Sequence, residues 1–162
     1  SLPHGVPSNK KVESGEFVLM DFGATYDGWH SDMTRTVCVG KPSDKMKSVY
    51  ETVLTAQLSA LDAVKAGMSG KALDKIARDI ITEAGYGDNF GHSLGHGVGV
   101  EIHESPYASP SREDILPENS IVTVEPGIYL EGKFGVRIED FVVVTENGCI
   151  NMTKAPKELI CF

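Results

Sequence analysis

Three of the five histidines in this chain, His92, His96 and His103, fall within one fifteen-residue segment, Phe90–Glu104. Four glycines lie in the same segment: Gly91, Gly95, Gly97 and Gly99. Glycine lets the backbone adopt a positive φ or approach a ligand closely at no steric cost. The segment is therefore not typical of a plain helix or strand, and we expect a loop that enters a strand at Val98–His103. Such a loop needs carboxylates from elsewhere to complete a site.

Four carboxylates in other parts of the chain can complete a metal site with one of these histidines. Two precede the segment and two follow it: Asp21, Asp32, Glu125 and Glu139. Carboxylate-only sites suit Mg²⁺ or Ca²⁺, and an added imidazole shifts the preference towards manganese, iron, cobalt or zinc. Two such ions about 3.5–4 Å apart generate a hydroxide near neutral pH and polarise a carbonyl group. These residue types predict a hydrolase with one histidine and four carboxylates around a pair of divalent metals.

A β-hairpin is expected to carry the first two carboxylates. Two β-prone runs, Phe17–Gly23 and Trp29–Val39, are joined by an Asp-Gly dipeptide typical of a two-residue hairpin turn. That turn places Asp21 opposite Thr34, with Asp32 two residues along the second strand on the same face. Two carboxylates on one half-buried face repel each other unless a cation lies between them. Taken singly, Asp32 is better explained as a solvated residue and Asp21 as a strand-end residue, but that explanation is weaker for the two together.

Two helices are expected after the hairpin, over Ser43–Ala66 and about Gly70–Ala84. Ser43 is a favourable N-cap, and apolar residues recur at helical spacing in both segments. Glycines follow both stripes and end the helices. Both stripes are wide and ordinary, so the two helices are predicted to cover a sheet and to take no part in the chemistry.

Two further strands are expected to present the last two carboxylates. The β-branched run Ile121–Glu125 ends at a proline, so Glu125 lies at a strand end, where site residues tend to project. A second strand is expected over Gly135–Thr145. Arg137 and Glu139 are two residues apart there and share a face. An ordinary ion pair between those two side chains explains the spacing as well as a functional site does.

Composition bounds the class of protein. The chain has 162 residues, 41% of them hydrophobic, and a net charge of −8, which argues against nucleic acid or an anionic membrane as the main partner. Its cysteines, Cys38, Cys149 and Cys161, form no CxxC pair and are odd in number, so a reducing, cytoplasmic compartment is expected. No apolar run approaches the roughly 20 residues of a membrane span, and no signal peptide is visible. Because it begins at Ser1, we expect a piece of a longer protein.

Several motifs, taken in order, resemble those of the pita-bread-fold metallopeptidases, family M24. They are DFG, DG, SDMTRT, GHSLGHGVGVEIHE, VTVEPGIY and GVRIED, and the likeness runs from SLPHG to TKAPKELI. Within the family, the chain is similar to the Xaa-Pro peptidases, namely aminopeptidase P and the prolidase-type dipeptidases. The resemblance implies an α+β pita-bread fold that lacks its first helices. It also implies that residues 1–162 form a single catalytic domain without the N-terminal domain of the parent protein.

The resemblance also implies roles for individual residues. The metal ligands would be Asp21, Asp32, His96, Glu125 and Glu139, with Asp32 and Glu139 bridging two ions, most often manganese, with cobalt, zinc or iron as alternatives. The substrate-contacting residues would be His4, His92, His103 and Arg137. A hydroxide held by the metals would attack the carbonyl before proline while Glu125 shuttles a proton. His103 and His4 would steady the carbonyl and the leaving nitrogen. By itself, His4 in its irregular segment is typical of a surface residue.

The expected partner is a peptide with proline in the second position, and the family resemblance further implies a homodimer. One alternative is a methionine aminopeptidase-like enzyme, although VEPGIY and GVRIED favour the proline-specific branch. Another is an inactive metal- or peptide-binding module of the same fold, because a truncated chain can bind metal and still work poorly. Known relatives without metal have lost the ligand set, whereas all five positions here carry side chains that can coordinate.

Overall fold

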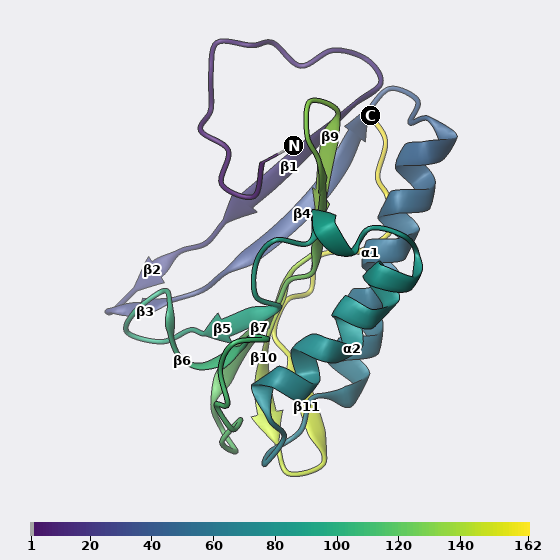
Figure 1. The fold of residues 1–162 in the computed structure, drawn as a ribbon. Coiled ribbons are helices and arrows are strands. Elements are labelled where there is room, and N and C mark those ends of the chain that lie inside the picture. Colours follow the sequence, from purple (N-terminus) through teal and green to yellow (C-terminus); the bar gives the residue numbers. More distant parts are fainter. Residues whose placement is uncertain (1) are drawn as a thin grey trace.

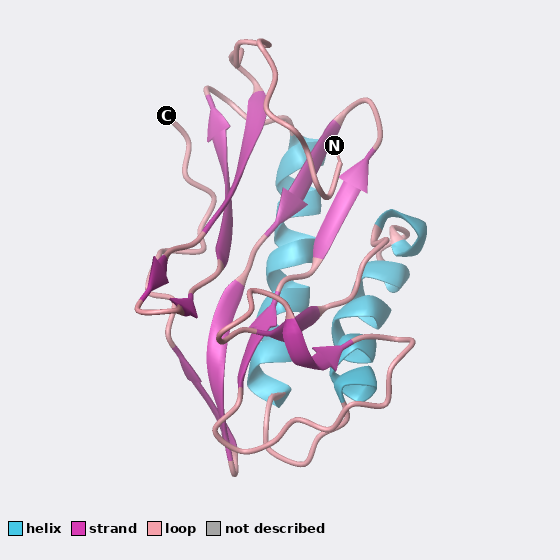
Figure 2. Ribbon diagram, turned by 90° about the vertical axis from the view of Figure 1, so that its left-hand side faces the viewer, coloured by secondary structure: helices cyan, strands magenta, loops and turns pink. Residues whose placement is uncertain are grey.

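The computed structural model describes residues 2–162, in which strands form one layer and two helices cover one of its faces (Figure 1). The largest sheet has five antiparallel strands in the order β11-β10-β7-β5-β6. Its strands are β5 (Gly95–Gly97), β6 (Glu104–Ala108), β7 (Ile121–Val124), β10 (Asp140–Thr145) and β11 (Gly148–Asn151). Two hairpins, β1–β4 and β8–β9, complete the layer, and Figure 2 shows both helices behind it.

The predicted N-terminal hairpin is confirmed in its register. Strand β1 (Glu16–Phe22) pairs antiparallel with β4 (Met33–Val39), and Asp21 lies opposite Thr34. The short strands β2 (Thr25–Tyr26) and β3 (Trp29–His30) extend this hairpin to its turn. Asp27 and Gly28 have φ values of 49° and 83°. Two positive φ values in a row are what a type I′ turn requires, and this local geometry fixes the register over the whole hairpin.

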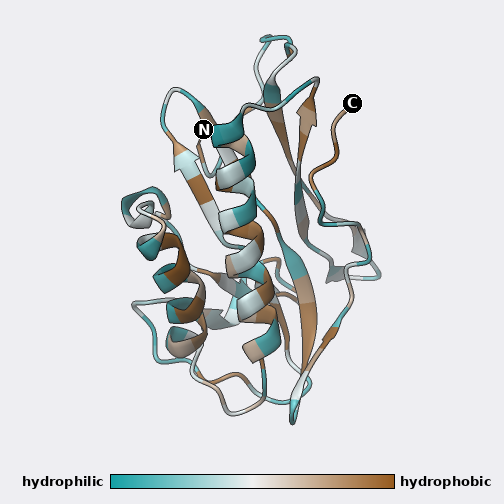
Figure 3. Ribbon diagram, turned by 90° about the vertical axis from the view of Figure 1, so that its right-hand side faces the viewer, coloured by the Kyte–Doolittle hydropathy of each residue, from teal (hydrophilic) through white to brown (hydrophobic). Residues whose placement is uncertain are grey.

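Both predicted helices are present. Helix α1 (Asp44–Ala63) is capped by Ser43, whose hydroxyl accepts the Met46 amide N–H at 3.2 Å. Helix α2 (Gly70–Glu83) is followed by a single 3₁₀ turn, η1 (Gly87–Asn89). Figure 3 shows α1 and α2 side by side in front of the strands. Their inner faces pack on the strands in one continuous hydrophobic core.

Two sequence-based expectations about strands are wrong. Residues 98–103 form no strand; the strands lie on either side, at β5 and β6, so that His96 is in a strand and His103 is not. The expected strand Gly135–Thr145 is divided into β9 (Phe134–Arg137) and β10. β9 pairs with β8 (Gly127–Leu130), whereas β10 pairs with β7. Because the pairing partner changes between them, Glu139 belongs to neither strand. It forms an isolated antiparallel bridge with Thr34 of β4, and its amide N–H donates to the Thr34 carbonyl oxygen at 3.1 Å.

The close approach of β5 to β7 explains one of the glycines. A Cβ atom at Gly95 would overlap the carbonyl oxygen of Thr123 on β7. Only glycine therefore fits at this point of the sheet. The consequence is local: His96 follows directly, and its amide N–H donates to the Thr123 hydroxyl at 3.0 Å. In the part of the chain that the structure describes, no helix is long and apolar enough to cross a bilayer.

Candidate active site

One cavity of about 220 Å³ is lined by every residue for which the sequence predicted a role. These nine residues are His4, Asp21, Asp32, His92, His96, His103, Glu125, Arg137 and Glu139. They come from the N-terminal loop, the β1–β4 hairpin, the segment around β5, the end of β7 and the junction of β9 with β10. The structure thus brings together side chains that lie up to 135 positions apart, from His4 to Glu139 (139 − 4 = 135).

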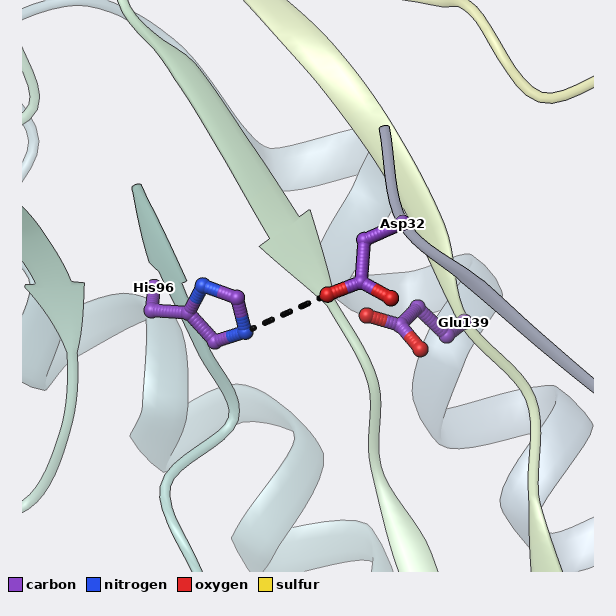
Figure 4. Close-up of side chains that lie close together, drawn as sticks. All are labelled: Asp32, His96 and Glu139. Atoms are coloured by element: carbon purple, nitrogen blue, oxygen red, sulfur yellow. Dashed lines mark ion pairs between the residues drawn. The ribbon is translucent and has the colours of Figure 1, made fainter. Parts of the chain in front are cut away.

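Three of these side chains form a group that can hold a metal ion. Asp32, His96 and Glu139 each offer one ligand atom, and these atoms lie within 4.8 Å of one another. Figure 4 shows the three side chains pointing towards one another from three separate segments. His96 Nε2 is 3.8 Å from Asp32 Oδ2 and 3.1 Å from Glu125 Oε1, so the fourth carboxyl borders the same space.

The orientation of the His96 ring suits coordination. Its Nδ1 lies 3.0 Å from the Gly97 carbonyl oxygen, which can only accept a hydrogen bond, so the proton is on Nδ1. The lone pair of Nε2 then points at the oxygens of Asp32 and Glu125. Lone pairs facing one another need a cation between them, either a proton or a metal ion. A backbone acceptor that fixes the tautomer in this way is a recurring feature of metal-ligating histidines.

Glu139 is buried and incompletely hydrogen-bonded. Its side chain is almost fully buried, and Oε2 accepts the Thr34 hydroxyl proton at 2.6 Å. The other oxygen, Oε1, has no hydrogen-bond partner among residues 2–162. A buried carboxylate oxygen without a donor is costly. A divalent ion bound in the cavity would satisfy it.

The electrostatics of the cavity favour a bound cation. Burial, followed by repulsion from Asp21, raises the pKa of Asp32 to about 6. Burial and the charges of Glu125 and Asp32 likewise raise the pKa of Glu139 well above its usual value. Burial also opposes ionisation of Glu125, but its hydrogen bond to His96 outweighs this effect and lowers its pKa. Four carboxylates therefore share one space in which two are difficult to ionise.

Arg137 is the one guanidinium that lines this cavity. Its Nη2 donates to Asp21 Oδ2, its Nε donates to the Thr34 hydroxyl at 3.0 Å, and Nε lies 3.9 Å from Glu125 Oε2. The ordinary ion pair considered between Arg137 and Glu139 is absent from the residues that the structure describes. The single positive charge faces Asp21 and Glu125 and leaves Asp32 and Glu139 without a cation.

The remaining histidines form one wall of the cavity. The ring centroids of His103 and His96 are 4.3 Å apart. Burial, together with the nearby His96, lowers the pKa of His103. Burial also lowers the pKa of His92, whose Nε2 is 2.9 Å from the Tyr129 hydroxyl. His4 is exposed at the edge of the cavity. The neutral imidazoles of His92 and His103 can donate or accept hydrogen bonds near pH 7.

Sequence reasoning missed three supporting residues. Thr34 bonds Glu139, Thr123 donates to Glu125 Oε1 at 2.9 Å, and the Tyr129 hydroxyl accepts from Arg137 Nη1 at 3.0 Å. A signal existed for the two threonines. Thr34 faces Asp21 across the predicted hairpin, and Thr123 is two residues before Glu125, on the same face of its strand.

A cavity in which several carboxylates and histidines converge has the residue types that hold divalent metal ions in metal-dependent hydrolases. The model of metallopeptidase family M24 matches residues 1–146, and the chain belongs to that family. It has the family's α+β pita-bread fold. Because members are metallopeptidases, divalent metal ions are part of the family's chemistry.

Relatives of known description match almost the whole chain. An Xaa-Pro dipeptidase of Pyrococcus furiosus is 54% identical over 160 residues, which are 99% of this chain and 46% of that protein. The solved structure of an Xaa-Pro dipeptidase from Bacillus anthracis has a TM-score of 0.97 at 54% identity and covers 99% of this chain and 45% of its own. An X-Pro aminopeptidase from Thermotoga maritima has a TM-score of 0.96 at 53% identity, with the same coverage of both chains. The chain thus spans under half the length of these relatives.

Proposed function

We propose that this chain carries the catalytic site of an Xaa-Pro peptidase, a metallo-exopeptidase that hydrolyses the bond between an N-terminal residue and proline. The observation that carries this proposal is the charge of the cavity. Among the described residues, four carboxylates line it against one guanidinium, and Glu139 Oε1 is buried without a donor. Such a cavity is electrostatically costly unless cations occupy it. The Xaa-Pro relatives and the family match supply the reaction class.

The proposed ligand set has five members: Asp21, Asp32, His96, Glu125 and Glu139. In this assignment, which follows the family resemblance, Asp32 and Glu139 would be shared by two ions, Asp21 would help to hold one, and His96 and Glu125 would help to hold the other. One imidazole among carboxylates suits manganese, with cobalt, zinc or iron as the other candidates. The 3.1 Å contact between His96 Nε2 and Glu125 Oε1 supports placing these two on the same ion.

Divalent ions bound here would activate a water molecule and polarise the carbonyl group of the scissile bond. Side chains of the chain itself would transfer the protons and donate the hydrogen bonds that the reaction needs. Glu125 has a lowered pKa, so it is ionised near neutral pH and can accept a proton and pass it on. His103 has a lowered pKa and can donate a hydrogen bond to the carbonyl oxygen. His4, at the edge of the cavity, would contact the leaving nitrogen.

Proline recognition must rest on shape and on protonation of its nitrogen. A prolyl amide has no N–H, so the enzyme cannot select it by offering an acceptor. The cavity is small, about 220 Å³, and its wall includes the rings of His92, His103 and Tyr107. Arg137 lines the cavity and would meet the negative end of a short peptide there. These features suit a short peptide whose second residue is compact.

The finer points of the proposal concern substrate length, assembly and location. The relatives include both an Xaa-Pro dipeptidase and an X-Pro aminopeptidase at nearly equal identity, so dipeptides and longer peptides are both candidate substrates. A homodimer is proposed from the family resemblance. A cytoplasmic location is supported by three cysteines that are all free.

The decisive experiment measures hydrolysis of Ala-Pro, Ala-Pro-Pro and Met-Ala-Ser with added Mn²⁺ and with a chelator. We expect chelator-sensitive cleavage of the proline peptides alone, with Met-Ala-Ser left intact. Glu139→Gln should abolish cleavage and lower the bound metal. Glu131→Gln alters an exposed glutamate in the β8–β9 turn and serves as the matched control, with full activity expected.

Other results would exclude the proposal in distinct ways. Cleavage of Met-Ala-Ser in preference to the proline peptides would identify a methionine aminopeptidase-like enzyme. Two bound metals per chain without any cleavage would leave a metal-binding module. A protein that binds no metal and cleaves no peptide would refute the ligand set itself.

A further inference from the structure

Helix α2 carries a charged pair on its buried face. Asp74 and Arg78 are four residues apart, with their side chains 1% and 25% exposed. Arg78 Nε donates to Asp74 Oδ2 at 2.7 Å, and Nη2 donates to Oδ1 at 2.9 Å. A carboxylate this deeply buried is expensive unless it is paired and its remaining lone pairs are satisfied. From its apolar stripe, α2 was predicted only to cover the sheet, and a buried charged pair is not needed for that.

The remaining hydrogen bonds of the pair all go to the backbone of residues 90–94. Arg78 Nη1 donates to the Phe90 carbonyl oxygen at 2.9 Å, and Nη2 donates to the His92 carbonyl oxygen at 2.8 Å. Asp74 Oδ1 accepts the Leu94 amide N–H at 3.0 Å. The guanidinium also lies over the Phe90 ring, 4.2 Å from its centroid. Two side chains on one helix thus hold three alternate residues of the histidine segment.

These three residues lead directly to the wall of the cavity. The His92 ring sits with Nδ1 2.8 Å from the Ser93 carbonyl oxygen and Nε2 2.9 Å from the Tyr129 hydroxyl. The Leu94 carbonyl oxygen accepts the Glu125 amide N–H at 2.8 Å. A displacement of the backbone at residues 90–94 would therefore move the His92 ring directly, whereas Glu125 is joined to this segment only through its backbone amide.

We propose that Asp74 and Arg78 form a clamp on α2 that positions the histidine segment, and His92 in particular, for substrate. The clamp rests on the proposed function, because it acts on residues assigned there to peptide hydrolysis. Asp74 and Arg78 do not line the cavity, so they are positioning residues. An irregular, glycine-rich backbone has few ladder hydrogen bonds of its own, which is why side chains from a neighbouring helix must hold it.

Arg78→Lys is the informative variant. Lysine keeps the positive charge beside Asp74, so no buried carboxylate is left unpaired and the fold is retained. Its single ammonium group cannot reproduce the planar fork that reaches Asp74 and two carbonyl oxygens at once. The same helix supplies a matched control: Lys75 and Asp79 form an exposed i,i+4 pair with 2.5 Å between Nζ and Oδ2. Lys75→Gln removes that pair without affecting residues 90–94.

Three quantities should be measured in the full protein: hydrogen exchange at the Leu94 amide, kcat/KM for Ala-Pro, and Mn²⁺ affinity. For Arg78→Lys we expect Leu94 exchange to be roughly tenfold faster, because Asp74 is less firmly held. We expect kcat/KM to fall roughly tenfold to a hundredfold, as misplacement of a substrate-contacting group does. Mn²⁺ affinity should stay within about threefold, because no side chain of the proposed ligands contacts the clamp. For Lys75→Gln all three should match the wild type.

Wild-type values for Leu94 exchange and kcat/KM in Arg78→Lys would overturn the proposal. So would a loss of Mn²⁺ affinity as large as the loss of kcat/KM, because the effect would then run through the metal site. If the wild-type protein binds Mn²⁺ but cleaves no proline peptide, the proposed function fails, and the exchange comparison between the two variants alone decides whether the clamp exists.

Discussion

Thr34 offers the sharpest test of how the cavity holds metal. Its side chain is fully buried on β4, and its hydroxyl forms hydrogen bonds with two charged groups. It donates to Glu139 Oε2 at 2.6 Å and accepts from Arg137 Nε at 3.0 Å. Thr34→Val keeps the shape of the side chain and removes only this hydroxyl. The variant would leave Glu139 with no hydrogen-bond donor on either carboxylate oxygen among the described residues.

The expected magnitude follows from these contacts. A hydrogen bond to a charged group contributes about 1.5–3 kcal/mol. The Thr34 bond favours the ionised form of Glu139, which is the form that binds metal. Removing this hydrogen bond therefore raises the free energy needed to ionise Glu139 by about 1.5–3 kcal/mol. Since about 1.4 kcal/mol corresponds to tenfold in an equilibrium constant, Mn²⁺ affinity should fall by roughly 10- to 100-fold.

The assay is a competition titration of metal-free protein with Mn²⁺ against a chelator of known affinity. Thr34→Ser, which retains the hydroxyl, should bind Mn²⁺ within about threefold of the wild type. Thr36→Val removes another buried hydroxyl two residues along β4; that hydroxyl bonds only the backbone of Arg137, so it controls for stability loss. Equal Mn²⁺ affinity in Thr34→Val and wild type would refute the reasoning, as would an equal loss in Thr36→Val.

Three other predictions follow from the same structure. Because folding raises the pKa of Asp32 to about 6, the protonated form of Asp32 favours the folded state. Its contribution to the free energy of unfolding is complete below pH ~4 and is lost as the pH rises through about 6. Metal-free protein should lose on the order of 2–3 kcal/mol over that range in urea unfolding, and Asp32→Asn should remove that part of the slope. Asp140 is fully buried and accepts hydrogen bonds from Arg35 and three other donors, so Asp140→Asn should lower the free energy of unfolding by about 3–5 kcal/mol; a change under about 1 kcal/mol would contradict this. Gly95→Ala would push a methyl group onto the Thr123 carbonyl oxygen and should cost about 1–3 kcal/mol, measured by thermal unfolding; an unchanged melting temperature would show that β5 and β7 can separate freely.

Several features could be predicted from the sequence because they depend on neighbours along the chain. The Asp27-Gly28 turn determines the hairpin register by its own dihedral angles, and so it places Asp21 opposite Thr34. The 3.6-residue period of apolar side chains locates both helices to within a few residues. The residue types of the cavity, four carboxylates with histidines, also follow from sequence alone, since they depend on chemical identity and not on distance.

The glycine-rich segment shows where local reasoning failed. Its strand was expected at Val98–His103, but it lies at Gly95–Gly97, because the absence of a Cβ at Gly95 allows close contact with Thr123. The pattern of the chain contains no information about that distant partner. Likewise the β-prone run after Gly135 breaks at Glu139 because its two halves pair with different strands.

What only the tertiary structure decided is how strongly the groups interact. The sequence determined that carboxylates, imidazoles and a guanidinium were present, and the family resemblance singled out His96 among the histidines. The folded chain determined how close His96 Nε2 lies to Asp32 and Glu125, that burial raises the pKa of Asp32 to about 6, and that a pair on α2 holds the histidine segment. Desolvation and Coulomb interactions depend on distances between groups far apart in the sequence, and these distances exist only once the chain has folded.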